Sequence, residues 1–131
     1  MAKAILDAIY SRLGGTYALS VATYGRIYLD RAPADSRYPL LVYRATEIKT
    51  TPYFGSLTRH EITLDFNIVY TDGDTTGCYT IADAIQSALS TPISVTGFDA
   101  ARCTRQSRGV PSMNEDAWTM IERYRVVAHD I

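Results

Sequence analysis

Two cysteines and two histidines are the side chains whose types could support nucleophilic chemistry. Cys78 and Cys103 lie far apart in the sequence, without a CxxC pair or a neighbouring histidine, and His60 and His129 form no sequence motif. A nucleophilic cysteine needs a histidine that takes its proton and a group that orients this histidine. The spacing provides neither, so the sequence predicts reduced, buried thiols and strand histidines that are exposed or hydrogen-bonded.

The segment 72–77, DGDTTG, has part of the spacing of a calcium-binding loop, with Asp83 at the position of the last ligand. That position is ordinarily a glutamate, and such a loop follows a helix, whereas this segment follows a predicted strand. We therefore favour the alternative that Asp74, Thr75 or Thr76 caps a helix. The sequence also lacks GxGxxG, GxxxxGK[ST], HExxH and GxSxG motifs, so it predicts no enzyme, no metal and no cofactor.

Three arginines, Arg102, Arg105 and Arg108, are spaced three apart in a predicted strand and its hairpin. At a period of two, Arg102 and Arg108 share one face of the strand and Arg105 lies on the other. One interpretation is a charged sheet edge that prevents unwanted strand pairing. The other is a basic strip that faces nucleic acid or an acidic partner in a larger assembly.

The composition excludes a free-standing nucleic-acid binder. The 131 residues contain 13 Lys+Arg and 14 Asp+Glu, a formal net charge of −1, whereas proteins that bind phosphates are usually strongly basic. The length predicts a single domain over residues 1–131 with a real hydrophobic core. The chain has 10 Tyr against 3 Phe and 1 Trp, a surplus that suits half-buried strands and protein interfaces.

No apolar run is long enough to cross a membrane, and Lys3, Asp7 and Arg12 interrupt the pattern that a signal peptide would need. We therefore expect a protein that is made in the cytoplasm and makes no membrane contact.

Periodic apolar positions predict two helices and several strands. Residues 2–13 and 78–89 have helical spacing, and 58–70 and 117–129 alternate between apolar and polar side chains. Residues 38–45 form a β-rich run, a further strand is expected within 93–107, and a short extended piece at 27–29. Residues 16–25 are expected to form a short strand or an irregular crossing.

Two segments are predicted to be projecting loops. Residues 47–57 are too long for a tight hairpin and carry the adjacent aromatics Tyr53 and Phe54, and residues 108–116 form a polar hairpin tip. Together, these elements predict an α+β fold: a largely antiparallel sheet of four to five strands, two helices packed on one face, and long projecting hairpins.

The order of these segments resembles the tail terminator, or tail completion, proteins of tailed bacteriophages over nearly the full chain. The similar segments are AILDAI at 4–9, GRIY at 25–28, APADSRYPLLVY at 32–43, IVY at 68–70, IADAI at 81–85 and YRVVA at 124–128. The long aromatic segment 47–57 departs from the resemblance. The resemblance implies a virion protein that forms a hexameric ring, caps the tail tube, ends tail polymerisation and joins the tail to the head connector, while genomic DNA passes through the lumen.

This interpretation suggests working surfaces. The expected subunit and partner contacts are Tyr38, Tyr43, Tyr53, Phe54 and Met113. The expected lumen or DNA-facing residues are Arg102, Arg105 and Arg108. Two alternatives stay open: a neck protein that seals the head, and a small-molecule-binding α+β module that uses the cleft between helices and sheet.

Overall fold

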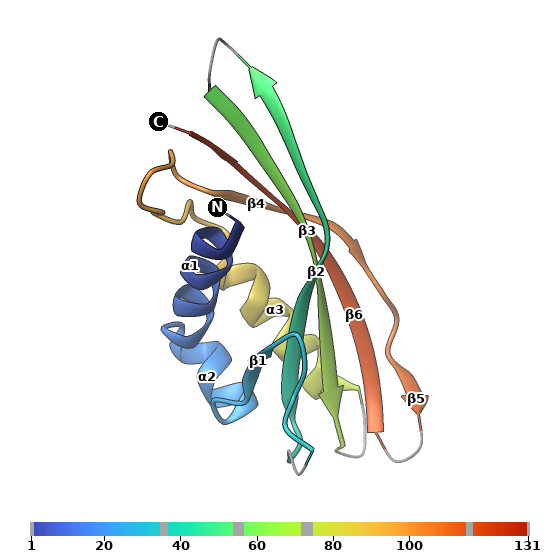
Figure 1. Ribbon diagram of the computed structural model, residues 1–131. Helices are drawn as coiled ribbons and strands as arrows, with labels where there is room; N and C mark the ends of the chain where they lie inside the picture. Colours follow the sequence, from blue (N-terminus) through green and yellow to red (C-terminus); the bar gives the residue numbers. More distant parts are fainter. Residues whose placement is uncertain (1, 35–36, 54–56, 72–74, 115–116, 131) are drawn as a thin grey trace.

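The computed structural model describes residues 2–34, 37–53, 57–71, 75–114 and 117–130. These described residues form three helices and a six-stranded sheet, which confirms the α+β class. Figure 1 shows the helices beside the twisted sheet. The sheet has one strand, and the protein one helix, beyond the number expected. In the described residues, no helix has the length and apolarity that crossing a membrane requires.

Two helices follow the predicted apolar stripes. Helix α1 (Ala2–Gly14) buries Ile5, Ile9 and Leu13 completely and ends at the first residue of the Gly14–Gly15 pair. Helix α3 (Thr76–Ala88) buries six residues along one stripe: Cys78, Ile81, Ala82, Ala84, Ile85 and Ala88. Thr75 occupies the position before α3 but makes no side-chain capping hydrogen bond, and residues 72–74 lie outside the described residues.

Residues 17–23 form a helix, α2 (Tyr17–Thr23), so the expectation of a strand or irregular crossing is wrong. The helix is short and buries only Leu19 and Thr23, four residues apart, while Tyr17 and Val21 face solvent. β-branched and aromatic side chains have low intrinsic helix propensity. Packing of α2 against α3 therefore selects the helix where local preference favours extended chain.

The sheet is built around three long strands. β2 (Leu40–Tyr53), β3 (Leu57–Tyr70) and β6 (Ala117–His129) pair antiparallel, and β4 (Arg102–Arg108) adds to the far side of β6. β1 (Ile27–Leu29) pairs parallel with the start of β2, and β5 (Ser112–Asn114) pairs with the start of β6. The long-strand order is therefore β2–β3–β6–β4, with a short strand added at either side.

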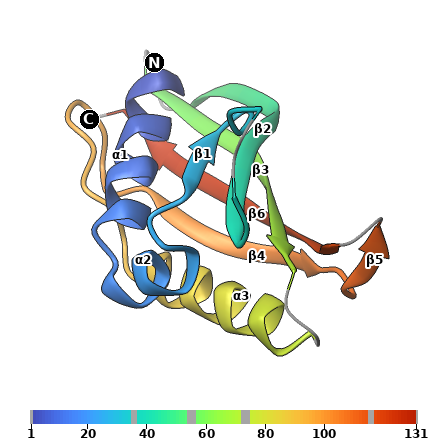
Figure 2. The ribbon, with the colours of Figure 1, turned by 90° about the horizontal axis from the view of Figure 1, so that it is seen from below.

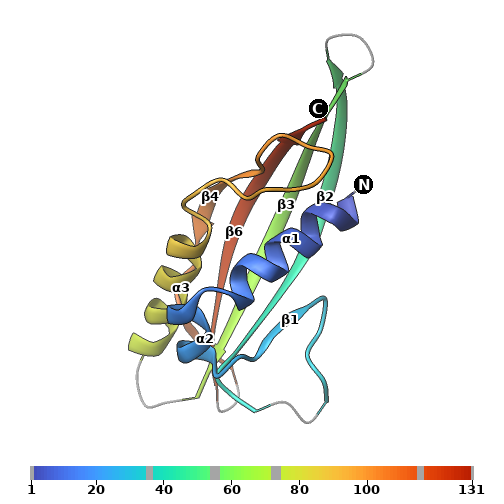
Figure 3. The same ribbon diagram turned by 90° about the vertical axis from the view of Figure 1, so that its left-hand side faces the viewer.

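The two predicted loops contain strand. Residues 47–53 continue β2, so the hairpin is a long two-stranded ribbon whose residues 54–56 lie outside the described residues. Figures 1 and 3 show this ribbon extending beyond the helices. Residues 112–114 also pair with β6. The prediction of loops from polar composition was wrong because hydrogen bonds to an antiparallel neighbour can keep a polar, threonine-rich segment extended even when neither of its faces is buried.

All three helices cover one face of the sheet (Figure 2). On β3, Ile62, Leu64, Phe66 and Ile68 point toward the helices and are completely buried. Phe66 is central: its ring stacks on Tyr43 at 5.4 Å and meets the edge of Tyr124 at 5.3 Å. No helix of the described residues lies on the other face of the sheet, and this open face carries the polar half of each alternating strand.

Candidate assembly surfaces

The open face of the sheet carries cross-strand rows of charged side chains. Asp65 of β3 lies between Arg44 of β2 and Arg123 of β6 in one row. Arg123 donates to both carboxylate oxygens of Asp65, from Nε at 2.8 Å and from Nη2 at 3.2 Å, and this raises the arginine pKa. Arg123 and Asp65 therefore form a bidentate, charge-assisted contact, which fixes the geometry of both side chains at the surface.

A second part of the open face has more cations than anions. Arg59 pairs with Glu61 at 2.7 Å. Four further basic side chains of this face are exposed and have no ion-pair partner among the described residues: Arg44, Lys49, Arg102 and Arg125. Glu47, also exposed, is the acid beside them on β2. A protein with a net charge of −1 therefore has a basic region on its open face.

The predicted arrangement of the three arginines is wrong. A bulge in β4 between Arg105 and Ser107 inserts Gln106 and shifts the alternation by one residue. Arg105 and Arg108 consequently share the helix-covered side of the sheet, and Arg102 alone lies on the open face. A period of two applied to the sequence cannot detect an inserted residue, which explains the error.

Arg105 and Arg108 are held by a buried carboxylate. Arg108 Nε donates to Glu122 Oε2 at 2.6 Å, and Arg105 Nη1 lies 3.8 Å from the same oxygen. Arg108 also reaches Asp83 on α3 at 3.1 Å, and Arg105 donates to Gln86 of α3 at 3.0 Å. These contacts tie β4 and β6 to α3, so they explain these two arginines as internal ion-pair partners.

Glu122 is a buried ionisable residue that was not among the candidates predicted from the sequence. Its side chain is completely buried on the core side of β6, and its Oε1 has no hydrogen-bond partner in the described part of the chain. Burial raises the pKa of Glu122, and the hydrogen bond and charge of Arg108 oppose this shift. The available signal was an acid at an inward position of an alternating strand, between Met120 and Tyr124.

The predicted contact residues fall in three environments. Tyr43 is completely buried and stacked on Phe66, so its prediction as a contact with other subunits is wrong. Tyr38 and Met113 are 48% and 54% exposed and are free to meet a partner. Tyr53 ends β2, and its side chain, like the whole of Phe54, lies outside the described residues.

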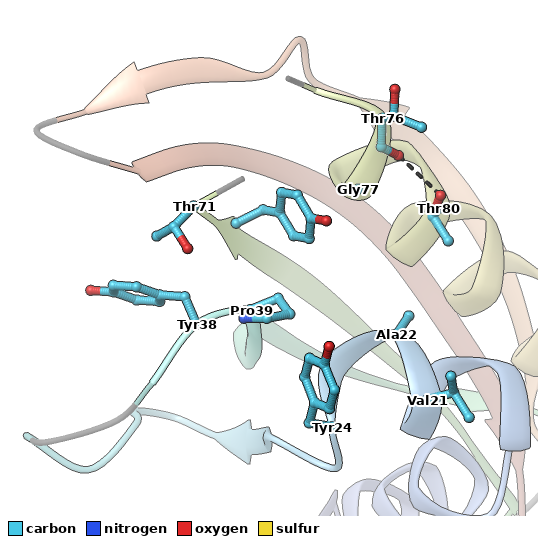
Figure 4. Close-up of a pocket in the computed structure, with 10 residues that line it drawn as sticks. Val21, Ala22, Tyr24, Tyr38, Pro39, Thr71, Thr76, Gly77 and Thr80 are labelled. Carbon is cyan, nitrogen blue, oxygen red and sulfur yellow. Dashed lines mark hydrogen bonds between the residues drawn. The ribbon is translucent and has the colours of Figure 1, made fainter. Parts of the chain in front are cut away.

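Tyrosines also line a cavity of about 450 Å³ between α2, the start of β2 and the start of α3 (Figure 4). Tyr24 and Tyr38 form its walls together with Pro39, and Thr71 and Thr80 add hydroxyl groups. Tyr70 also lines it and packs so closely on Gly77 that a Cβ at Gly77 would overlap the ring. Tyr24 is 72% exposed, so the cavity is an open hollow with aromatic walls.

The cysteines lie wholly or partly in the interior, and the histidines contact carboxylates. Cys78 is buried and Cys103 half-buried; burial raises the pKa of both thiols, to about 11 for Cys103. His60 Nε2 lies 2.9 Å from Asp130 Oδ1, and His129 Nδ1 lies 3.2 Å from Asp99 Oδ2. The prediction of hydrogen-bonded strand histidines is confirmed. Within the described ranges, no group of three or more His, Cys, Asp or Glu side chains could hold a metal ion.

The fold and its exposed features define a small α+β protein that presents a charged sheet face and tyrosine-bearing helices to other molecules. The chain belongs to the family described as Tail completion protein gp17, whose model matches residues 7–127. The resemblance noted in the sequence is therefore confirmed at the level of the family. No protein of curated function matches the chain significantly.

Solved structures share the fold at low sequence identity. One, described as the virion of a native gene transfer agent particle, has a TM-score of 0.69 at 14% identity, covering 98% of this chain and 96% of its own. A second, which carries no functional description, has a TM-score of 0.73 at 14% identity, with 98% and 95% covered. At this identity, the likeness shows that the whole fold is shared.

Proposed function

We propose that this protein is a structural tail terminator of a phage-like particle. In this role it forms a ring, hexameric in the simplest case, that caps the last ring of the tail tube, ends polymerisation and joins the tail to the head connector. The observation that supports this proposal most strongly is the family match over residues 7–127. The whole-length fold likeness to a structure described as the virion of a gene transfer agent particle supports a place in the virion. The location at the tail–neck junction follows from the proposed role.

The exposed surfaces support action by assembly without catalysis. A protein that joins a tail tube to a head connector needs exposed surfaces for contact with these partners. The chain offers the charged open face of the sheet and, on the opposite side, exposed tyrosines on the helices, including Tyr10, Tyr17 and Tyr79. Arginine and tyrosine are both enriched at protein interfaces, and exposed guanidinium groups bind aromatic faces.

Genomic DNA is proposed to pass through the lumen without sequence-specific binding. The near-neutral net charge supports passage, because tight binding would require many phosphate contacts. Of the three arginines considered for this role, Arg102 is exposed and unpaired among the described residues, whereas Arg105 and Arg108 contact Glu122. Arg102 is therefore the strongest candidate for contact with DNA.

The test is deletion of the gene in a particle-producing host. The expected result is heads filled with DNA that lack joined tails, together with free tails of abnormal length. Purified protein added to free tails should cap tube ends as six-fold rings in negative-stain images and restore joining. Heads that leak DNA beside tails of normal length would instead assign the protein to head closure, and normal particles would contradict both roles.

A further inference from the structure

One edge of the sheet is uncovered along most of β2. β1 pairs with β2 only at Leu41–Tyr43. From Arg44 to Tyr53, β2 has β3 on one side and no strand of the described chain on the other. The side chains of residues 46–52 are all exposed. Pro52 lies in this stretch, and a proline, which has no N–H to donate, is tolerated on an edge strand.

The opposite edge of the sheet, β4, is also uncovered. β4 pairs with β6 on one side, and on the other side Ile93 pairs only with Ala101, just before the strand begins. From Arg102 onward, no further strand of the described chain covers it. The side chains of Arg102 and of residues 104–107 are exposed. Uncovered edges present backbone donors and acceptors to which a strand of another chain adds.

The two open edges lie at the same height on the sheet. Cross-strand pairing defines one row as Lys49, Glu61, Val127 and Arg102, and a second row as Arg44, Asp65, Arg123 and Ser107. The open part of β4 therefore spans the same rows as the first half of the open part of β2. This matters because heterologous contacts between patches at matching heights close into rings, whereas unmatched ones generate helical filaments.

Strand direction is compatible with joining these edges. β2, β3, β6 and β4 alternate in direction, so β4 and β2 of one protomer run opposite to each other. In a cyclic ring, every protomer has the same orientation along the axis. β4 of one protomer would therefore meet β2 of the next in antiparallel orientation and continue the alternation around the ring.

We propose that a second copy of this chain pairs its β4 edge with the open β2 edge, so that ring assembly joins the sheets of neighbouring protomers through backbone hydrogen bonds. The inference rests on the proposed function, because it specifies the contact that builds the ring. Bulges in both edge strands, after Ala45 and after Arg105, lie within one row of each other. Such bulges increase local twist and bending, which a sheet that closes on itself requires.

Two observations favour a particular register between β4 and the neighbour's β2: the charges of the facing side chains and the part of β2 that β1 already occupies. Without a shift, Arg102 would lie beside the neighbour's Lys49, a like-charge pair, and Arg108 would meet Tyr43, where β1 is already paired. A shift of two residues toward the ribbon end places Arg102 beside Thr51 and clears β1. A closed barrel requires a stagger of this kind.

Disulfide cross-linking in assembled rings tests the pairing. In a Cys103→Ser background, the protein carrying Arg102→Cys and Thr51→Cys is assembled on tail tubes, imaged by negative stain and oxidised. Facing residues of paired strands have Cβ atoms about 4.5 to 5.5 Å apart, near the reach of a disulfide. Covalent oligomers that extend from dimer to the full ring are expected on non-reducing gels, and each single-cysteine variant should stay monomeric.

Three further pairs sharpen the result. Lys49→Cys or Glu47→Cys in place of Thr51→Cys tests another register between the two strands. Covalent oligomers with either variant also support the edge pairing. Thr63→Cys is the matched control, because Thr63 lies on the central strand β3 and should give no ladder. Rings that form without cross-links at positions 47, 49 and 51 would overturn the edge pairing and leave the proposed function standing. Failure to form rings or to bind tube ends would overturn the proposed function itself.

Discussion

The two faces of the sheet differ although the same strands build them. On β3, Phe66 is completely buried against Tyr43 and Tyr124, and its neighbour Asn67 is exposed. Toward the helices, the contacts are aromatic and aliphatic apart from the ion pairs of Arg105 and Arg108 with Glu122. On the open face, they are ion pairs such as Asp65 with Arg123. The helix-covered face packs against the chain's own helices, whereas the open face and two strand edges are available to other molecules.

This difference assigns the arginines to different tasks. Arg108 contacts buried Glu122 and α3, so it contributes to holding the subunit together. Arg102 and Arg125, on the open face, have no ion-pair partner among the described residues. Substitution on the covered face should therefore change the free energy of unfolding, and substitution on the open face should change assembly.

The largest expected effect is at Phe66. Phe66→Ala removes a fully buried ring between two aromatic neighbours and should lower the free energy of unfolding by about 3 to 5 kcal/mol. The matched variant Asn67→Ala, one residue along the strand, should change it by less than about 0.5 kcal/mol. Urea unfolding followed by circular dichroism measures both, and equal losses would break the distinction between the faces.

A smaller effect is expected from Glu122, and it should depend on pH. Burial raises the pKa of Glu122 above its ordinary value of about 4.5, so the folded protein binds this proton more tightly than the unfolded chain does. The stabilising contribution of this group is therefore full below about pH 4.5 and is lost as the pH rises through the folded-state pKa.

The variant Glu122→Gln removes this titration. The unfolding free energy of the natural protein relative to the variant should fall as the pH rises above about 4.5. Parallel unfolding curves at several pH values measure the difference. Asp65→Asn on the open face serves as the control, and a difference that rises with pH at position 122 would contradict the raised pKa.

The smallest effect is expected at Tyr43. Its hydroxyl is buried and has no hydrogen-bond partner within the residues that the structure describes, so Tyr43→Phe removes an unsatisfied polar group while the ring remains. The free energy of unfolding should rise by about 1 kcal/mol, because leaving a buried donor unpaired is costly. Tyr38→Phe, at a tyrosine that is 48% exposed, should leave it unchanged. A loss of stability in Tyr43→Phe would reveal a partner for this hydroxyl.

Local patterns predicted the elements whose exposure repeats regularly. The alternation along 58–70 and 117–129 and the apolar stripes of 2–13 and 78–89 correspond to β3, β6, α1 and α3. Local patterns gave wrong predictions for segments whose secondary structure depends on contacts with a distant element. Tyr17–Thr23 is helical because α3 packs against it, and residues 47–53 are strand because β3 pairs with them.

The candidate surfaces were predicted only in part. Exposed Tyr38 and Met113 agree with the expectation that they are available for contacts, whereas Tyr43 proved to be core. A tyrosine at an alternating position suits either a core or an interface, since its ring is apolar and its hydroxyl polar. Only the stacking partner Phe66, distant in sequence, decides between them.

By itself, the sequence determined the α+β class and the inward faces of the regular elements, because these depend on residue types repeated at fixed short intervals. It also carried the segments by which the chain resembles its family. The tertiary structure alone decided the bulge that turns Arg105 and Arg108 toward Glu122, and the two uncovered edges at matching heights. These features depend on strand register between segments far apart in the chain. Residue spacing within one segment carries no information about such a register.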